Sequence, residues 1–153
     1  LNIAAILLAF VALIALVNGV IGMVGGWFGI TNLSLQSILG YIFAPVAVII
    51  GVPMKEAVVA GSLIGQKIIL NEFVAFTSLS EIMSTLSAKT IAVVTFSLCG
   101  FANISSIAIL IGGIGGMAPS RKHDIARLGW KAVLGGTLAN LLSATIAGLL
   151  LTI

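Results

Sequence analysis

The sequence predicts an all-α integral membrane fold in which spanning helices are combined with a re-entrant helical hairpin and a discontinuous helix. Of the 153 residues, 60% are hydrophobic and only 7% are charged, whereas soluble domains carry about 25% charged residues. The uncharged segment 90–120 is long enough to cross a bilayer, which takes about 20 residues of helix, but polar residues interrupt its centre. A carboxylate, Glu72, lies with Asn71 in the otherwise apolar stretch 68–76.

Residues 1–30 are predicted to form the first spanning helix, which ends near Trp27. The segment has no charged residue and is long enough for a tilted span. Its second half is rich in glycine. The glycines either let another helix approach closely or mark a loosening helix end.

A second helix, interfacial or kinked, is predicted within residues 31–52. Asn32 or Ser34 can cap its start, and Pro45 interrupts the apolar run. Gly51 then provides a stop before the chain restarts.

Residues 53–87 have the pattern of a re-entrant hairpin, in which two short helices enter and leave on the same side. Pro53 suits the first turn of a helix, and this helix is too short for a comfortable full span. Asn71 and Glu72 come next, near the expected tip, and serines and threonines then return the chain to water. The alternative is a straight helix from Pro53 to Met83, whose length suits a tilted span.

Residues 88–120 are predicted to form a discontinuous transmembrane helix. The break lies in the run Cys99–Ile107, where weak helix formers cluster and three side chains compete for the backbone. These weak helix formers are Gly100, Asn103, Ser105 and Ser106. Irregular backbone at membrane depth is tolerated only where protein or a water-filled cavity satisfies it. A lined cavity is therefore expected at the break.

Residues 121–131 are predicted to be a basic cytoplasmic loop, because cytoplasmic segments carry an excess of Lys and Arg. Four of the seven cations of the chain fall here: Arg121, Lys122, Arg127 and Lys131. The uncharged segment 132–153 would then be the last transmembrane helix, with the C-terminus outside. The broken helix would run from outside to inside, and the hairpin would enter and leave from the outside.

On the last helix, small residues recur every four positions and predict a face for tight helix packing. They are Gly135, Ala139, Ser143 and Ala147. Asn140 lies off this face, and a structural hydrogen bond is favoured for it over a ligand role.

Glu72 is the first candidate site residue. A carboxylate in hydrocarbon costs at least about 2.5 kcal/mol and is a functional-site hypothesis by default. An ionised carboxylate only accepts hydrogen bonds, so it suits a ligand rich in hydroxyl groups. The alternative is a structural pair with Lys67 or Lys55. A buried acid beside a broken helix is typical of the midplane site of a secondary transporter.

Asn103, Ser106 and Phe101 are the other candidates. The amide and the hydroxyl suit sugar hydroxyls, although both residue types also cap helices, and Ser105 is the favoured cap here. Phe101 packs either on a flat apolar face of the solute or in the core.

The sequence excludes several functions. One cysteine, Cys99, rules out an intramolecular disulfide and is interpreted as a small buried residue. His123 is interpreted as a solvated residue of the basic loop and not as a proton relay. No metal cluster, cofactor motif or enzyme motif is present, and no pattern indicates nucleic-acid binding. No enzyme activity, cofactor or metal is expected.

Two motifs in order resemble the C-terminal half of the concentrative nucleoside transporters. The first is Leu70–Ala75 and the second is Gly100–Ala108. Three further segments are similar to the same family, so that the resemblance covers nearly the whole chain. These are Gly51–Pro53, Gly61–Gly65 and the stretch from Met117–Pro119 through Gly135–Thr137.

The resemblance implies a homotrimeric symporter built from inverted repeats, in a bacterial cytoplasmic (inner) membrane. Residues 1–30 would be the scaffold helix near the trimer axis, while 53–84 and 89–116 would be the second hairpin and the second broken helix of a moving transport domain. Glu72, Asn103 and Ser106 would bind ribose hydroxyls, and Phe101 would lie against the base.

The implied function is cation-coupled uptake of nucleosides by alternating access, with Na⁺ or H⁺ as the coupling ion. Base recognition and the cation site are expected in an N-terminal half of the same protein, so this chain alone should not transport. The partners are the nucleoside, the bilayer and the other protomers. The alternatives are a non-transporting helical assembly subunit and a proton or ion pathway that uses Glu72.

Overall fold

A computed structural model describes residues 2–151, and these residues form helices and connecting turns without a strand. The all-α prediction is confirmed. In chain order the elements are α1 (Asn2–Trp27), α2 (Leu35–Ile49), η1 (Met54–Glu56), α3 (Ala57–Ile69), α4 (Glu72–Ile82), η2 (Met83–Thr85), α5 (Ala88–Leu98), α6 (Ile104–Met117), η3 (Pro119–Arg121) and α7 (Lys122–Leu150).

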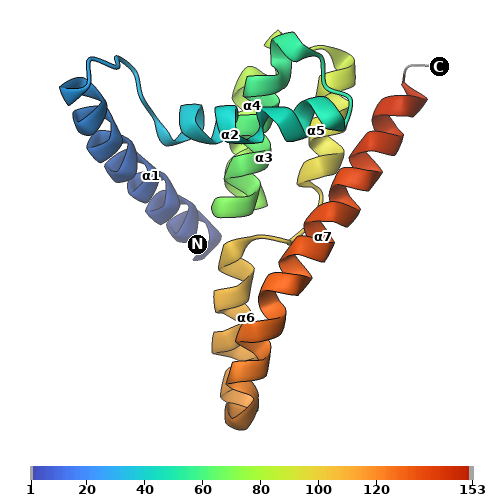
Figure 1. Ribbon diagram of the computed structural model, residues 1–153. Coiled ribbons are helices and arrows are strands. Elements are labelled where there is room, and N and C mark those ends of the chain that lie inside the picture. Colours follow the sequence, from blue (N-terminus) through green and yellow to red (C-terminus); the bar gives the residue numbers. More distant parts are fainter. Residues whose placement is uncertain (1, 152–153) are drawn as a thin grey trace.

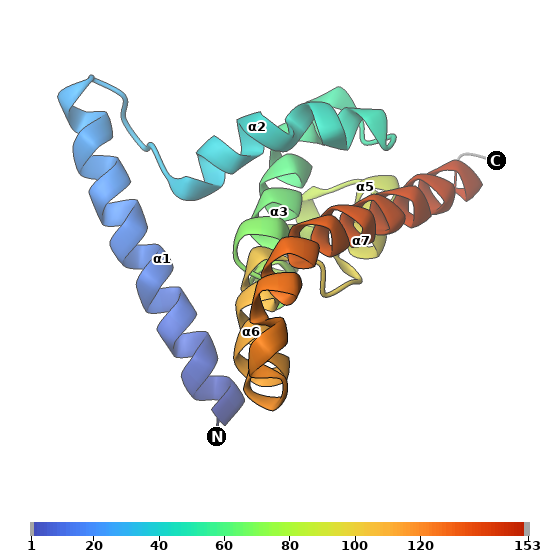
Figure 2. The same cartoon turned by 60° about the horizontal axis from the view of Figure 1, so that its bottom comes forward.

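Helix α1 lies to one side of the other helices in both views (Figures 1 and 2). It stays helical through its glycine-rich half as far as Trp27, so the glycines do not loosen its end. One of them permits a close approach, because a Cβ atom at Gly25 would lie 2.9 Å from the Leu33 Cβ atom. The approaching segment is the connection to α2 and not another helix.

Helix α2 begins and ends where the sequence predicts. Of the two candidate caps, Ser34 is the one used, since its Oγ accepts a hydrogen bond from the Ser37 N–H at 3.1 Å. At the other end Gly51 has φ +99, a conformation that glycine adopts without strain. The Val52 N–H donates to the Ala47 carbonyl at 3.0 Å, which closes a Schellman-type cap.

Helix α2 crosses α3 at close range (Figure 1). Glycines make this possible: a Cβ atom at Gly61 would lie 2.6 Å from the Ala44 backbone nitrogen. A Cβ atom at Gly40 would lie 2.8 Å from the Val58 carbonyl oxygen. The backbones of α2 and α3 are therefore in contact, and α3 packs directly on α2.

Helices α3 and α4 form a hairpin, so the alternative of one straight helix from Pro53 to Met83 is wrong. Leu70 leaves the helical conformation at φ −99 and ψ −92, and Asn71 is extended. Asn71 then caps α4 by accepting a hydrogen bond from the Val74 N–H at 2.9 Å. The hairpin packs into a core shared with α2, α5 and α7, whose members include Ala60, Leu63, Ala75, Leu79, Val93, Val94, Leu98 and Ala144.

The predicted break is present between α5 and α6. Helix α5 ends at Leu98 and α6 begins at Ile104, with a non-helical connection between them. Figure 1 shows this connection beside the lower end of the hairpin, about halfway along the molecule.

Residues 121–131 are helical, so the predicted basic loop is wrong. Pro119 starts a 3₁₀ turn, and α7 continues from Lys122 without interruption. Asp124 lies in the first turn, where an acidic side chain stabilises the helix N-terminus, and Arg121 donates to it at 3.0 Å. Charge indicated exposure correctly, but charged residues are also good helix formers.

Within the described residues, α7 packs through a different face from the predicted small-residue face. A Cβ atom at Gly135 would meet no other atom within 4 Å, and Ala139 and Ser143 are exposed. The contacts are made instead from Gly129 against Ile107, Gly136 against Ala102 and Gly148 against Val93. A strict repeat of four drifts around a helix that has 3.6 residues per turn, whereas alternating steps of three and four keep to one face.

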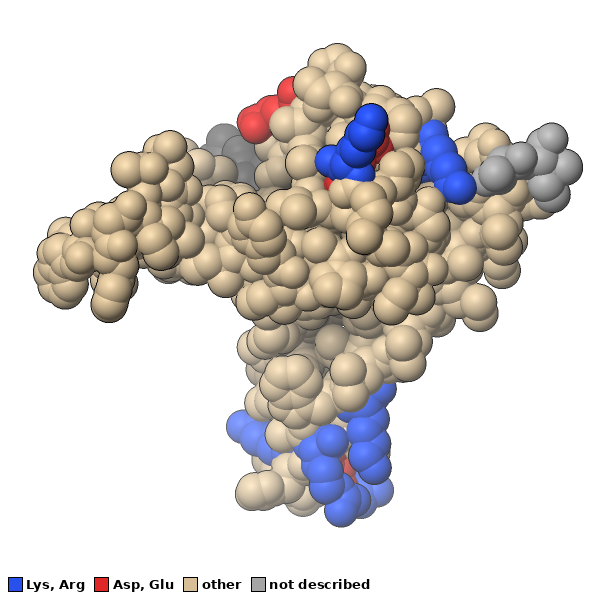
Figure 3. Space-filling view, turned by 45° about the horizontal axis from the view of Figure 1, so that its top comes forward, with Lys and Arg blue, Asp and Glu red and all other residues tan. Residues whose placement is uncertain are grey.

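On the face drawn in Figure 3, the charged side chains lie at two ends of the molecule, and the surface between these ends is uncharged. One end is the α6–α7 junction with Arg121, Lys122 and Arg127. Among the described residues, the helix Pro119–Leu150 is long and apolar enough to cross a membrane. This distribution agrees with a chain that lies in a bilayer.

Candidate functional site

The tip of the hairpin is joined to the helix break by two side-chain hydrogen bonds. The Asn103 amide donates from Nδ2 to Oε2 of Glu72 at 2.8 Å. The Ser105 hydroxyl donates to the carbonyl oxygen of Leu70. Two segments about 30 residues apart in the sequence therefore form one local structure, as the two polar motifs predicted.

Asn103 is the cap of α6, and the prediction that Ser105 is the cap is wrong. Its Oδ1 atom accepts a hydrogen bond from the Ser106 N–H at 2.8 Å, and the hydroxyl oxygens of Ser106 and Ser105 lie 2.9 Å and 3.1 Å from the same atom. Only 3% of Asn103 is exposed. Its amide therefore has two structural tasks, capping α6 and holding Glu72.

Two helix N-termini meet at Glu72. This residue is the first of α4, and its partner Asn103 precedes the first turn of α6. The N-terminal end of a helix carries a partial positive charge and stabilises a nearby carboxylate. The position of Glu72 thus offsets part of the cost of placing an acid in an uncharged environment.

The site keeps unused hydrogen-bonding capacity. Glu72 is half-buried, and its Oε1 atom has no partner among the described residues, nor has the second N–H of the Asn103 amide. The single hydroxyl proton of Ser106 goes to the Phe101 carbonyl at 2.6 Å or to Asn103, which leaves its oxygen free to accept. Acceptors and a donor side by side suit a solute with several hydroxyl groups.

Phe101 is 79% exposed, so it is not a core residue of the described chain. It lies in the break and lines a hollow of about 220 Å³ between α6 and α7 together with Ser106. An aromatic ring beside a hydroxyl provides a flat apolar surface next to a polar one.

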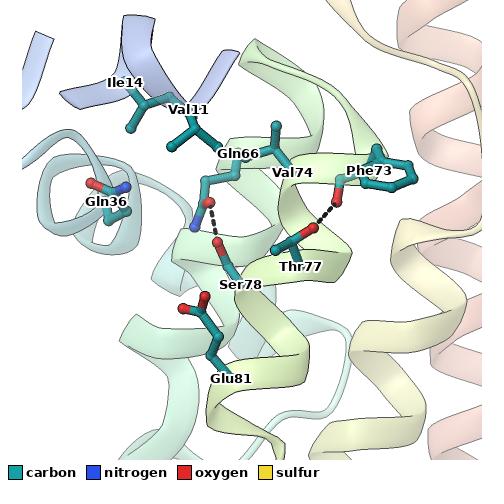
Figure 4. Close-up of a pocket in the computed structure, with 9 residues that line it drawn as sticks. All are labelled: Val11, Ile14, Gln36, Gln66, Phe73, Val74, Thr77, Ser78 and Glu81. Carbon is teal, nitrogen blue, oxygen red and sulfur yellow. Dashed lines mark hydrogen bonds between the residues drawn. The ribbon is translucent and has the colours of Figure 1, made fainter. Parts of the chain in front are cut away.

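A larger pocket of about 250 Å³ lies elsewhere, between α1, α2 and the hairpin (Figure 4). Its polar lining includes Gln66, which accepts from the Ser78 hydroxyl at 2.9 Å and donates to the Ser62 hydroxyl at 3.2 Å. Glu72 does not line it. Sequence reasoning missed this pocket, although Gln66 in an apolar stretch was a signal that could have indicated it.

A second carboxylate ties the base of the hairpin to α5. Glu56 accepts from the Ser87 N–H at 3.1 Å through Oε1 and from the Ser87 hydroxyl at 2.8 Å through Oε2. Ser87 is also the cap of α5, because its Oγ accepts from the Thr90 N–H at 3.3 Å. The hydroxyl groups of Thr90 and Ser87 lower the pKa of Glu56 below its usual value.

Helix α7 packs against the break between α5 and α6. The amide of Asn140 lies against Gly100, where a Cβ atom would be 2.1 Å from Nδ2. No hydrogen bond of this amide is found within residues 2–151, so the structural hydrogen bond stays a prediction. Cys99 in the same break is exposed, contrary to its interpretation as a buried residue. His123 is exposed, as predicted.

Nothing in the described part of the chain forms a cluster of three or more His, Cys, Asp or Glu side chains that could hold a metal ion. Lys67, a possible structural partner of Glu72 in the sequence analysis, is 1% exposed and lies in the last turn of α3. The ion pairs found within the described residues join Asp124 to Arg121 and Arg127, so Lys67 forms no ion pair with Glu72 or Glu56.

Comparison with known proteins identifies the family. A family described as Na⁺ dependent nucleoside transporter C-terminus matches residues 1–148. The chain belongs to this transporter family. The resemblance noted in the two sequence motifs is thereby confirmed.

Individual relatives agree with the assignment. The chain is 61% identical to an uncharacterized transporter, YutK, of Bacillus subtilis and 51% identical to nucleoside permease NupC of Helicobacter pylori, in each case over 97% of the chain and 37% of the relative. It is 38% identical to human solute carrier family 28 member 3, over 97% of the chain and 24% of the relative. The chain thus spans little more than a third of the length of its bacterial relatives.

Solved structures match the fold closely. CNTnw in an inward-facing substrate-bound state superposes with a TM-score of 0.91 at 57% identity, over 97% of this chain and 37% of that one. A CNTnw variant in an intermediate state gives a TM-score of 0.93 at 55% identity, over 99% of this chain and 37% of that one. The arrangement of helices described above is therefore similar to that of the matching part of CNTnw.

Proposed function

We propose that this chain is the C-terminal part of a cation-coupled nucleoside importer and carries the ribose-binding side of its site. The observation that carries the proposal is the hydrogen bond from Asn103 to Glu72. It holds a carboxylate at the meeting point of the hairpin and the broken helix and leaves one of its oxygens free. Family membership supports the nucleoside as the solute.

Each candidate residue has a role in this proposal. Glu72 accepts hydrogen bonds from ribose hydroxyls through Oε1, and Asn103 donates through its second N–H. Ser106 accepts through its hydroxyl oxygen. Phe101 presents its exposed ring to the base.

The proposed mechanism is alternating access. The hairpin and the break are hydrogen-bonded to each other, and α1 lies to one side of them, so we expect the hairpin and the broken helix to move together as one body past α1. Related structures titled inward-facing, intermediate and outward-facing support such a movement. The pocket between α1 and the hairpin gives this movement room.

The membrane arrangement completes the proposal. The basic start of α7 lies on the cytoplasmic side of a bacterial inner membrane, and the C-terminus lies outside. The exposed apolar side chains of α1, among them Leu16, Val20 and Met23, face lipid or the other protomers of a homotrimer. The coupling cation, Na⁺ or H⁺, binds in the N-terminal half of the protein.

The test uses the complete transporter in proteoliposomes. Labelled uridine should accumulate under an inward Na⁺ or H⁺ gradient, other nucleosides should compete, and free nucleobases should compete poorly. A helical assembly subunit would give no uptake, and an ion pathway through Glu72 would give current without nucleoside. Either of these results would overturn the proposal.

A further inference from the structure

The net charge of the chain is concentrated where α6 meets α7. Four cations lie there with a single acid, Asp124, so three positive charges are unbalanced, which equals the formal net charge of +3 of the whole chain. The cations are Arg121, Lys122, Arg127 and Lys131, and all four are exposed. Figure 3 shows this end as a cluster of Lys and Arg side chains. It therefore presents an excess of positive charge to its surroundings.

Arg127 and Lys131 lie on one face of α7. They are four positions apart in a continuous helix, so their side chains are neighbours about 6 Å apart along the axis. Asp124 lies closer to Arg121, at 3.0 Å, than to Arg127, at 4.0 Å. The Arg127 side chain is 78% exposed, and no ion pair of Lys131 is found within the described residues. Both cations can therefore reach one external anion.

The same face of α7 continues as a stripe of exposed leucines. Leu134, Leu138 and Leu142 follow Lys131 in steps of three and four and are 60%, 66% and 63% exposed. From Lys131 to Leu142 the helix rises about 16 Å, roughly half of the ~30 Å hydrocarbon core of a bilayer. Helix α7 is also the described helix that is long and apolar enough to cross a membrane. The leucine stripe therefore has the length of one leaflet.

The opposite side of α7 is packed against the rest of the chain. A Cβ atom at Gly129 would lie 2.9 Å from Ile107. Lys122 belongs to this packed side, because a Cβ atom at Gly115 would lie 2.9 Å from its Cγ atom. Lys122 precedes Lys131 by nine positions, which is two and a half helical turns. The two lysines therefore share one end of the molecule but point to opposite sides of the helix.

We propose that the exposed face of α7 binds an anionic phospholipid from the leaflet in which this basic end lies. Arg127 and Lys131 hold the headgroup phosphate between them, and Arg127 can donate to it through two N–H groups. One acyl chain lies along the leucine stripe, which a free phosphate would not use. Trp130, which is 55% exposed beside Lys131, lies at the headgroup level that its ring favours. Basic side chains at the ends of transmembrane helices bind such headgroups.

The test titrates the complete transporter in detergent with dioleoylphosphatidylglycerol or dioleoylphosphatidylcholine and counts bound lipids by native mass spectrometry. Wild type should bind one phosphatidylglycerol per chain about tenfold more tightly than phosphatidylcholine. Arg127→Gln and Lys131→Gln should each weaken phosphatidylglycerol binding by about five- to tenfold and leave phosphatidylcholine binding unchanged. Lys131→Arg should bind as wild type does.

Lys122→Gln is the matched control, since it removes the same charge from the same end on the other side of the helix, and it should bind phosphatidylglycerol within about twofold of wild type. Thermal unfolding should be the same in all variants, because the substituted side chains are exposed. sn-Glycero-3-phosphoglycerol, the headgroup without acyl chains, should not compete with the lipid.

Four results would overturn the proposal. Equal affinity for the two lipids would show that the headgroup charge is not recognised. An equal loss in Lys131→Gln and Lys122→Gln would show a general attraction to the basic end. No loss in Arg127→Gln or Lys131→Gln would show that another part of the complete protein covers this face. Competition by sn-glycero-3-phosphoglycerol as strong as that of the lipid would show a site for free phosphate esters.

Discussion

Two glutamates at opposite ends of the hairpin use the same device. Glu56 at the base accepts hydrogen bonds from Ser87, and Glu72 at the tip accepts one from Asn103. In both pairs the partner lies 31 residues further along the chain and caps the helix that directly follows it, since Ser87 caps α5 and Asn103 caps α6. Each carboxylate therefore ties one arm of the hairpin to one half of the broken helix.

The two pairs differ in how completely the carboxylate is used. Both oxygens of Glu56 accept hydrogen bonds from Ser87, at the base of the hairpin, where η1 also carries Lys55 and the start of α5 carries Lys89. At the tip, one oxygen of Glu72 accepts the hydrogen bond from Asn103, and the other has no partner among the described residues. A carboxylate whose two oxygens both accept hydrogen bonds from the protein has a structural role. A carboxylate at the same kind of junction with one free oxygen is available to a ligand.

Asn103→Ala gives the largest expected effect. It removes the cap of α6, the bond to Glu72 and a proposed donor to ribose, so uridine affinity should fall by about 100-fold or more. The matched change at the base, Ser87→Ala, removes a cap and the hydroxyl bond to Glu56, while the backbone N–H of residue 87 still donates to Glu56. It should lower the free energy of unfolding by about 1–2 kcal/mol and leave uridine affinity within about twofold.

Isothermal titration and chemical denaturation of both variants make the comparison. Equal losses of uridine affinity in Asn103→Ala and Ser87→Ala would remove the distinction between the two ends of the hairpin.

Gly100→Ala tests the support of the break and should have an intermediate effect. The new methyl group would lie 2.1 Å from Nδ2 of Asn140, so the amide must move away. We expect a loss of about 1–3 kcal/mol in the free energy of unfolding, because overpacking of this kind costs that much. Asn140→Ala in the same protein should restore most of the loss. A single variant as stable as wild type would show that α7 does not hold the break.

Glu56→Gln has the smallest expected effect, and it depends on pH. Because the folded pKa of Glu56 is depressed below about 4.5, its ionised form stabilises the fold above that pH. The contribution is lost as the pH falls below 4.5 and through the folded pKa. The variant should be less stable by about 1 kcal/mol at pH 7, a modest value because the pair is close to solvent. Thermal unfolding at pH 7 and pH 3 checks this, and a stability difference that persists at pH 3 would contradict it.

The sequence was sufficient to predict the elements that carry the site. Polar residues in apolar surroundings located both the hairpin tip at Asn71 and the break before Ile104. These positions are predictable because the cost of polar groups at membrane depth leaves few explanations for them.

Other features were not predictable, for physical reasons. Asn103 and Ser105 are both good caps, and the capping preference that they share could not predict that α6 uses Asn103. The pairing of Glu56 with Ser87 joins positions 31 residues apart, and local patterns carry no information about it. The basic segment was misread because high charge is typical of both loops and exposed helices.

The central claim is that the free oxygen of Glu72 is available to ribose and that Glu56 has no such role. The most direct measurement is binding of uridine and of 2′,3′-dideoxyuridine to the complete transporter as wild type, Glu72→Gln and Glu56→Gln. Uridine affinity should fall by about 10- to 150-fold in Glu72→Gln, since hydrogen bonds to a charged group contribute about 1.5–3 kcal/mol. The dideoxy analogue should bind wild type and Glu72→Gln alike, and Glu56→Gln should bind both ligands as wild type does. Equal binding of uridine to wild type and Glu72→Gln, or an equal loss for both ligands, would contradict the ribose assignment.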